Sequence, residues 1–299
     1  MMSTRLSNFK TKLENYIISN LNSLRFELTE SIMLRWARVQ YEKDYSLDRG
    51  DPLITVYIPT YNRGKILLER ALPSVLSQTY KNFELVIIGD HCTDDTEKLV
   101  SSVNDPRVRF YNLPSRGWRY PETAENHWFA GPVVPANKAL ERATGKWIAR
   151  VDDDDTWTVD HLEKLLRLAQ ENNFEFVSGQ YMGLRDGEKT VCGGVRAASY
   201  YSRKKMQGND TSPLIGGTST WLYRSYLTFM KYNINCWRKS WNRVNDADFG
   251  DRVYRAGVRM GFLPEVLSFI SPRPGENQVG LGAYLSKAKE KEEHYKFDG

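Results

Sequence analysis

Apolar residues recur every three or four positions through the first 45 residues of the chain. The repeating positions are Leu6, Phe9, Leu13, Ile17, Leu21, Leu24, Leu28 and Ile32. This spacing predicts one or two amphipathic helices ahead of the main fold. The same region also contains Trp36, Arg25, Arg35 and Arg38. Two interpretations stay open: a helix packed on the back of the domain, which the periodicity favours, or an element for peripheral membrane contact or oligomerisation.

From residue 53 onward, short apolar runs alternate with segments of helical spacing. The runs over 53–62, 83–90, 108–113 and 146–151 predict strands, and the first of them is rich in β-branched residues. Helical spacing is found over 65–78, 93–103 and 136–145. The alternation predicts an α/β fold with a mainly parallel sheet covered by helices. Residues 115–135, rich in glycine, proline and aromatic residues, predict a long loop.

The pattern loosens in the second half of the chain. An amphipathic helix is predicted over 158–173, an antiparallel hairpin over 174–195, a helix over 245–257 and a strand over 260–270. The charged residues over 283–296 predict a solvated helix. We therefore expect an N-terminal helical extension (1–50), one domain (51–275) and a charged C-terminal tail (276–299).

Composition and charge narrow the class of protein. Apolar residues make up 40% and charged residues 26% of the chain, as in an ordinary globular protein. No apolar run is long enough for a membrane span or a signal peptide, so we expect a cytoplasmic protein, peripheral at the membrane if the first helices bind lipid. The net charge of +5 suits an anionic ligand. Basic residues are spread along the chain without a nucleic-acid-binding module, so no nucleic acid is expected.

The three cysteines lie far apart and form no CxxC pair. Their positions are Cys92, Cys192 and Cys236. This spacing predicts neither a disulfide framework nor a structural zinc site, so we expect buried thiols.

Four consecutive aspartates, Asp152 to Asp155, follow the predicted strand over 146–151. Neighbouring carboxylates repel each other by about 2 to 3 kcal/mol per pair at an effective dielectric constant near 20. In an extended segment Asp152 and Asp154 would share one side, with Asp153 on the other. A hard divalent cation bridging carboxylates to phosphates would relieve the repulsion. The alternative is a solvated acidic loop or a helix cap, with Asp155 and Asp160 facing the next helix.

Three segments in order resemble the inverting glycosyltransferases of family two, which have the GT-A fold. They are PTYNR (59–63), GDHCTDDT (89–96) and VDDDDTW (151–157). The resemblance is close over 52–172 and thinner up to about residue 280. It implies a single Rossmann-like, mixed but mainly parallel sheet, with a nucleotide-sugar-binding half (51–158) and an acceptor half (159–275). The implied activity is metal-dependent, inverting transfer of a sugar from a nucleoside diphosphate to an acceptor hydroxyl in glycan or polysaccharide assembly.

The resemblance also implies roles for single residues on the donor side. Nucleotide binding falls to Pro59, Thr60, Tyr61, Arg63, Asp90, Asp152 and Asp153. Asp90 would accept the imide N–H of uracil or thymine, which favours UDP or dTDP over GDP as the donor nucleotide. Asp153 would lie near the ribose, and Asp154 with Asp152 would bind Mn²⁺ or Mg²⁺.

On the acceptor side, the resemblance makes Asp246 the candidate base, with Asp248 second and Asp251 a weaker third. Trp221 and Tyr223 are candidates to stack on an acceptor sugar, with Asp248 beside them; core packing explains these aromatic residues equally well. The acceptor would be a glycan, a lipid-linked sugar or another hydroxyl compound.

Three departures from the family pattern concern charge. Asn245 replaces a glutamate, Ala136 replaces an arginine near the diphosphate, and Arg273 stands where a histidine can complete the metal site. Lys138, Arg116 and Arg119 are candidates to replace the missing cation. The loop with Arg116 and Arg119 is a candidate lid over the donor.

Two alternatives to the glycosyltransferase remain. One is a non-catalytic nucleotide- or sugar-binding module of the same fold. The other is a sugar nucleotidyltransferase, which would need a glycine-rich phosphate loop that PTYNRGKIL lacks. The donor sugar, the acceptor and the linkage are not indicated by any motif.

Overall fold

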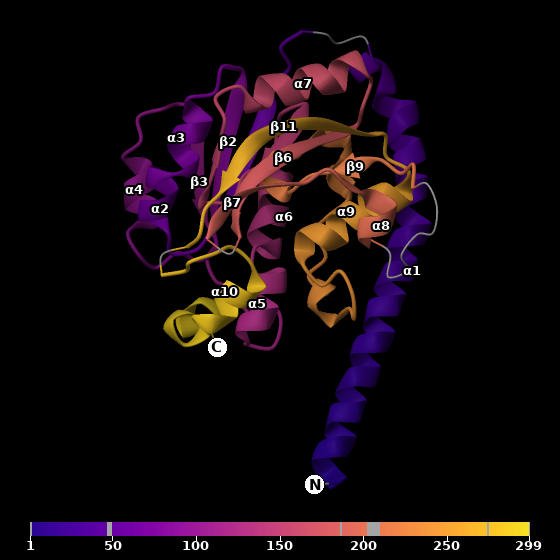
Figure 1. Cartoon of the computed structure of the whole chain (residues 1–299), viewed down its shortest axis with the longest axis vertical. Coiled ribbons are helices and arrows are strands. Elements are labelled where there is room, and N and C mark those ends of the chain that lie inside the picture. The colour runs from indigo at the N-terminus through magenta and orange to yellow at the C-terminus, as the bar shows by residue number, and fades with distance from the viewer. Residues whose placement is uncertain (1, 47–49, 186, 202–209, 274, 299) are drawn as a thin grey trace.

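A nine-stranded, mixed sheet forms the centre of the protein (Figure 1). The computed structural model describes residues 2–46, 50–185, 187–201, 210–273 and 275–298. The strand order is β3-β2-β1-β4-β10-β6-β11-β5, with β7 paired to β6. The strands of this sheet are β1 (Ile54–Thr60), β2 (Phe83–Gly89), β3 (Val108–Asn112), β4 (Trp147–Arg150), β5 (Asp155–Trp157), β6 (Phe176–Arg185), β7 (Glu188–Cys192), β10 (Leu222–Arg224) and β11 (Met260–Ile270). The first four strands pair in parallel, and the hairpin of β6 and β7 is antiparallel, as predicted.

Helices cover the sheet, and a small two-stranded sheet lies beside it. The helices are α1 (Met2–Ser46), α2 (Gly64–Glu69), α3 (Ala71–Leu76), α4 (Thr96–Ser101), α5 (Ala124–Ala130), α6 (Val133–Arg142), α7 (His161–Glu171), α8 (Ala197–Tyr201), α9 (Asn245–Ala256) and α10 (Leu281–Ser286). The small sheet pairs β8 (Val195–Arg196) with β9 (Leu214–Ile215). Short 3₁₀ segments are η1 (Thr218–Thr220), η2 (Ser225–Phe229), η3 (Cys236–Arg238) and η4 (Ala288–Tyr295).

Two local predictions differ from the structure. The helix predicted over 65–78 is divided into α2 and α3 at Arg70, whose backbone leaves the helical region at φ −121° and ψ −81°. Pro73 does not cause the break, because it lies in the first turn of α3, where a missing N–H costs little. The loop predicted over 115–135 contains α5 and the start of α6, and the Thr123 side chain caps α5.

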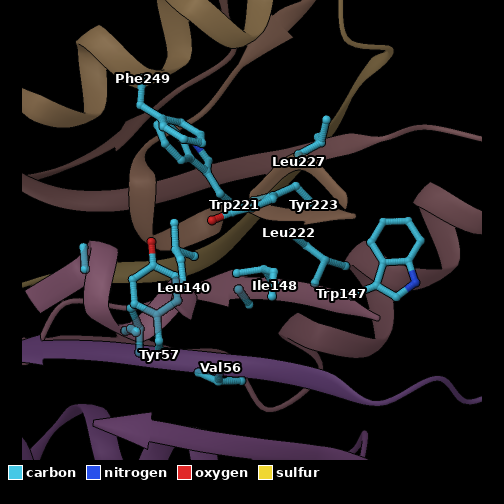
Figure 2. Close-up of a cluster of buried hydrophobic side chains, with 14 of the residues drawn as sticks. Val56, Tyr57, Leu140, Trp147, Ile148, Trp221, Leu222, Tyr223, Leu227 and Phe249 are labelled. Atoms are coloured by element: carbon cyan, nitrogen blue, oxygen red, sulfur yellow. The ribbon is translucent and has the colours of Figure 1, made fainter. Parts of the chain in front are cut away.

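The core lies between the central strands and the helices and aromatic residues packed on them (Figure 2). Every residue of β1 is buried, as expected for a parallel strand covered on both faces. Because β1, β2 and β4 run in parallel, their carboxyl ends meet at one edge of the sheet. Thr60, Asp90 and the aspartate run all follow or end these strands, so the fold gathers them at that edge.

The N-terminal extension is one helix, α1, which packs along the domain and projects beyond it (Figure 1). Its domain-facing side includes Glu30, Leu34, Ala37 and Tyr45, which are buried. The apolar positions that predicted the helix, from Phe9 to Ile32, are exposed instead. The prediction of a helix on the back of the domain is confirmed, but the face that packs is a different one.

The prediction of a solvated C-terminal helix holds for most of its charged side chains but not for Lys291, and the segment is packed on the domain. Residues 281–295 form α10 and η4, which pack against α5. Lys291 is buried and forms an ion pair with Glu276, and its ammonium group lies over the ring of Tyr284 at 4.6 Å. These pairings allow a charged segment to pack on the domain, because each buried charge has a partner.

Candidate donor and acceptor sites

A cleft of about 980 Å³ lies at the carboxyl ends of β1, β2 and β4. Its lining includes Pro59, Thr60, Tyr61, Arg63, Asp90, Asp152, Asp153, Asp154, Asp246 and Arg273, so it brings together most of the residues predicted from the sequence. We call this cleft the donor cleft. His127, Trp128, Arg150, Asn245, Tyr284 and His294 also line it, and none of them was predicted as a site residue.

Arginine side chains neutralise most of the aspartate run. Arg63 Nη1 donates to Asp153 Oδ1 and to Asp154 Oδ2, both at 2.9 Å. Arg273 Nε donates to the same Asp154 oxygen at 3.1 Å. Asp152 accepts from Arg150 at 2.9 Å. Three guanidinium groups therefore face three of the four carboxylates, which offsets their mutual repulsion.

The predicted alternation of sides within the run is wrong. The Asp155 N–H donates to the Asp152 carbonyl at 3.1 Å, so the segment turns instead of remaining extended. Asp153 and Asp154 consequently face the same arginine. Asp155 does not face the next helix either, because its carboxyl group is buried and accepts from the Ser219 hydroxyl.

The buried aspartates differ in their titration. Burial raises the pKa of Asp155 well above its usual range, and the neighbouring carboxylates Asp154 and Asp152 add to this effect. Burial also raises the pKa of Asp153, against the charge of Arg63. Burial also acts to raise the pKa of Asp154, but the charges of Arg63 and Arg273 outweigh burial and lower this pKa. Asp154 is therefore the carboxylate of this group that remains charged most readily.

Asp90 is held by the two arginines that the sequence placed in a lid. Arg119 donates to both carboxylate oxygens at 2.7 Å, and Arg116 Nε donates to one of them at 3.2 Å. The guanidinium group of Arg116 lies 4.2 Å from the ring centre of Tyr61 and 4.9 Å from that of Phe297. Arg116 also donates to the carbonyls of His294 and Lys296. Both arginines are thus buried beneath the C-terminal segment, and they support Asp90 instead of forming an open lid.

Asp246 lies in the first turn of α9, where the helix dipole favours a carboxylate. Its two oxygens accept from Thr218 Oγ1 at 2.6 Å and from the Ala247 N–H at 2.7 Å. Asp246 lines the donor cleft and also a second cavity of about 870 Å³, which we call the second cavity. The carboxylate is therefore shared by two adjoining spaces, an arrangement that suits a group acting between two substrates.

The predicted acceptor residues divide between the core and the second cavity. Tyr223 is fully buried and stacks on Phe176, so it has no surface for a sugar (Figure 2). Trp221 is 2% exposed and stacks on Phe249, but one edge lines the second cavity. Core packing therefore explains Tyr223 fully and Trp221 in large part.

Asp248 and Asp251 face away from the donor cleft. Asp248 accepts from Lys239 at 2.9 Å and from Arg252 at 3.0 Å, and Asp251 accepts from Arg255 at 2.8 Å. Both aspartates line a groove between α1 and α9 instead. Their positions contradict a role as base or acceptor ligand, because helical spacing turns them away from Asp246.

The cations available to a diphosphate differ from those predicted. Lys138 is partly exposed and pairs with Glu141 on the surface of α6, and Ala136 is buried. The arginines that line the donor cleft are Arg63, Arg150 and Arg273. Arg150 precedes the aspartates in β4 and offered a signal in the sequence, since a charged residue within a buried strand needs a local partner.

A divalent ion fits this site only together with a substrate. Asp152 and Asp154 line the donor cleft and offer the hard oxygen ligands that Mg²⁺ and Mn²⁺ prefer. Among the described residues, no group of three or more His, Cys, Asp and Glu side chains forms a complete metal site. Mg²⁺ usually takes one or two carboxylates and completes its sphere with water and phosphate oxygens. Arg273 contributes a positive charge, and no ligand, where the family has a histidine.

The fold defines a structural class of proteins, those with the GT-A fold. The protein TarS of Staphylococcus aureus, solved in complex with UDP-GlcNAc, matches 75% of this chain and 60% of its own, with a TM-score of 0.55 and 21% identity. The mannosyltransferase PcManGT of Pyrobaculum calidifontis, in complex with GDP-Man and Mn²⁺, matches 89% of this chain and 70% of its own, with a TM-score of 0.51 and 16% identity. These likenesses confirm the predicted GT-A fold.

The particular family follows from the sequence comparison. The model of glycosyl transferase family 2 matches residues 55–120 and 125–229, more than half of the chain. The chain belongs to this family, which confirms the resemblance.

Two curated relatives illustrate the range of the family. An uncharacterized glycosyltransferase of Rickettsia felis is 35% identical over 142 residues, 47% of this chain and 21% of that protein. The UDP-Glc:alpha-D-GlcNAc-diphosphoundecaprenol beta-1,3-glucosyltransferase WfgD of Escherichia coli is 30% identical over 131 residues, 44% of this chain and 46% of that protein. The matched region thus spans less than half the length of either relative. None of the described helices of this chain has the length and apolarity of a membrane span.

Proposed function

We propose that the protein is an inverting glycosyltransferase that moves a sugar from a nucleoside-diphosphate sugar to an acceptor hydroxyl in glycan or polysaccharide assembly. The observation that supports this most directly is the position of Asp246, whose carboxylate lines both the donor cleft and the second cavity. Family membership supports the donor class, and the bound UDP-GlcNAc of TarS supports a uridine nucleotide.

In the proposed reaction, Asp246 acts as general base. Its carboxylate accepts the proton of the acceptor hydroxyl while that oxygen attacks the anomeric carbon of the donor sugar. The bond between the anomeric carbon and the diphosphate oxygen breaks, and its electron pair leaves with the nucleoside diphosphate. Attack from the side opposite the leaving group inverts the anomeric configuration. The hydrogen bond from Thr218 holds the carboxylate in place for this role.

The leaving diphosphate would lie against the aspartate run and its arginines. Arg63 and Arg273 can pair with phosphate oxygens when a nucleotide enters, because guanidinium groups bind phosphates as they bind carboxylates. Asp152 and Asp154 would hold Mn²⁺ or Mg²⁺ bound to the diphosphate, and such an ion supplies Lewis-acid stabilisation of the leaving group. Asp90 would accept the imide N–H of the base, with Tyr61 beside it, so we propose UDP or dTDP in preference to GDP.

The second cavity is the candidate acceptor site. Its lining includes Tyr181, Tyr200 and the edge of Trp221, and aromatic rings of this kind stack on sugar rings. The name of WfgD describes a sugar linked to diphosphoundecaprenol as its acceptor. A lipid-linked or other glycan acceptor is therefore proposed for this chain.

The test uses the full chain with Asp246→Asn and, as matched control, Asp51→Asn, which removes an exposed carboxylate far along the chain from α9. With Mn²⁺ and a panel of nucleotide sugars, we expect donor hydrolysis or transfer to fall by roughly 10²- to 10⁴-fold in Asp246→Asn. Donor affinity, measured by calorimetry, should stay within about twofold of wild type. A non-catalytic module would bind nucleotide with metal but turn over none in any variant. Wild-type turnover that survives in Asp246→Asn would contradict the assignment of the base.

A further inference from the structure

The longest apolar surface on the molecule lies along α1, on the side that faces away from the domain. Its side chains are 47% to 87% exposed. They are Leu13, Ile17, Leu21, Leu24, Leu28, Ile32 and Val39, which we call the outer stripe. Contiguous exposed apolar surface of this extent usually marks a binding surface.

The domain cannot cover the outer stripe, because it already packs on the opposite face of α1. Arg252 lies over the ring of Phe26 at 4.3 Å and pairs with Glu30, and Tyr45 contacts Trp147. Leu28 follows Phe26 by two residues, which is a rotation of about 200° in an α-helix. The helix thus has two apolar faces on opposite sides, and the structure fills one of them.

The outer stripe has the regularity of a seam between helices. Ile17, Leu28 and Val39 are spaced eleven residues apart, and the residues between them repeat at steps of three and four. An eleven-residue repeat keeps apolar side chains on one side of a long helix and is typical of helix–helix packing with a slight right-handed twist. The stripe runs over about 40 Å at the usual helical rise.

The outer stripe is also complementary to itself. About the point between Asn22 and Ser23, its members fall into symmetric pairs. The pairs are Leu21 with Leu24, Ile17 with Leu28, and Leu13 with Ile32. In an antiparallel pair of identical helices related by a twofold axis at this point, each residue meets its symmetric partner, and the contact occurs twice.

We propose that the outer stripe is the interface with a second copy of this chain, joined through antiparallel α1 helices. The six paired side chains would bury on the order of 600 Å² per chain, the lower end of the size of a stable interface. The two domains would lie on the outer sides of the helix pair, so the arrangement brings no clash between them. This inference is independent of the proposed activity.

A bilayer surface would also cover an apolar stripe, but two observations favour a second copy. Membrane binding needs no symmetry about a point in the helix, whereas a twofold interface requires it. Both signs of charge flank the stripe, at Glu14 and Arg25, whereas helices that bind anionic lipid are rich in Lys and Arg.

One pair of charged residues allows an experiment to distinguish a second copy of the chain from a lipid surface. Lys10 and Arg35 are symmetric about the same point, so they face each other in the antiparallel pair and repel. Lys10→Glu would turn two repulsive contacts into two ion pairs in the dimer. On an anionic membrane the same substitution would only remove attraction.

The experiment measures the mass of the full chain by sedimentation and light scattering between about 1 and 100 µM, a range that brackets moderate dimer affinities. Wild type is expected to be a dimer, and Leu24→Glu a monomer with unchanged unfolding temperature, because Leu24 is exposed in the single chain. The matched control Gln40→Glu adds the same charge to an exposed position outside the outer stripe and should leave the dimer intact. Lys10→Glu should tighten the dimer by roughly tenfold.

Cross-linking tests the direction of the helices. A mixture of Ile17→Cys and Leu28→Cys chains should form a disulfide on oxidation, whereas Ile17→Cys alone should not. Efficient cross-linking of Ile17→Cys to itself would indicate parallel helices and overturn the register. A monomeric wild type at 100 µM, combined with binding to phosphatidylglycerol vesicles that Leu24→Glu and Lys10→Glu both weaken, would overturn the proposal in favour of a lipid surface.

Discussion

The guanidinium group of Arg119 donates one hydrogen bond to each carboxylate oxygen of Asp90, both at 2.7 Å. This bidentate contact fixes the plane of the carboxylate at the end of β2. Each carboxylate oxygen has two lone pairs, so Asp90 retains acceptor capacity toward the donor cleft that it lines. Asp90 is thus oriented before a nucleotide arrives.

A nucleotide altered at one atom tests the role proposed for Asp90. UDP methylated at the imide nitrogen lacks the N–H that the carboxylate would accept. We expect it to bind wild type at least about tenfold more weakly than UDP, the loss of one hydrogen bond to a charged group. Calorimetry with both ligands measures the ratio of their dissociation constants. In Asp90→Asn the ratio should shrink toward one, and an equal affinity of wild type for both ligands would exclude this contact.

The second prediction concerns Arg273 and metal binding. Arg273→His replaces a cation beside Asp154 with a neutral nitrogen ligand, so Mn²⁺ should bind the UDP complex more tightly, by roughly tenfold for one added ligand. Electron paramagnetic resonance of Mn²⁺ in the presence of UDP measures the affinity. Arg273→Gln is the matched control, since it removes the charge without supplying an imidazole, and it should give a smaller gain. Equal Mn²⁺ affinity in all three chains would show that Arg273 does not adjoin the ion.

The third prediction separates members of the aspartate run by stability. Burial raises the pKa of Asp155 well above its usual range and so disfavours its charged form, and Asp155→Asn replaces it with a neutral group of the same shape. It should cost less than about 1 kcal/mol of unfolding free energy. Asp154→Asn leaves Arg273 without a charged partner and Arg63 with Asp153 alone, and should cost roughly 3 kcal/mol. Urea unfolding at pH 7 measures both losses, and equal losses would contradict the different roles assigned to the two carboxyl groups.

The fourth prediction is a pH dependence caused by Glu30. Burial raises the pKa of Glu30 to about 7, although its carboxylate faces Arg252, with Asp248 on the far side of that guanidinium. The unfolded chain releases this proton near pH 4.5, the usual value, and the folded chain only near pH 7. The folded state therefore binds more protons between these values, and its stability falls as the pH rises from 5 to 8.

Glu30→Gln should remove this contribution. The wild type should lose on the order of 2 kcal/mol relative to the variant between pH 5 and pH 8. Chemical unfolding of both chains at several pH values measures the difference between their free energies of unfolding. The titration of all other groups is common to both chains and cancels in this difference. Parallel curves for the two chains would show that Glu30 does not titrate in this range.

The sequence was sufficient to predict the fold because its signals are local. Strands β1, β2 and β4 are short apolar runs, and parallel strands bring Thr60, Asp90 and the aspartates to one edge without further information. The partners of those aspartates were not predictable in this way. Arg273 is 119 residues from Asp154, and only the tertiary fold brings the two together.

Periodicity and composition did not predict which side chains of α1 and of the C-terminal segment are buried. Residues Phe9 to Ile32 predict a helix, but α1 has a second apolar face, and the spacing cannot tell which one meets the domain. In the C-terminal segment, charge predicted exposure. Lys291 is nevertheless buried because Glu276 neutralises it, a pairing between residues that no local pattern connects.

The partners of the aspartate run have a consequence for how the protein can change through evolution. Asp152 contacts a side chain of β4, and Asp153 contacts side chains of β1 and of the loop after it. Asp154 contacts side chains of that same loop and of the segment after β11, and Asp155 contacts a side chain of η1. A substitution at any of these partners leaves a carboxyl group or a guanidinium group uncompensated. Four distant parts of the chain are therefore expected to vary together. A descendant that loses Arg273 should keep Asp154 only if it acquires another cation or a more tightly held metal ion.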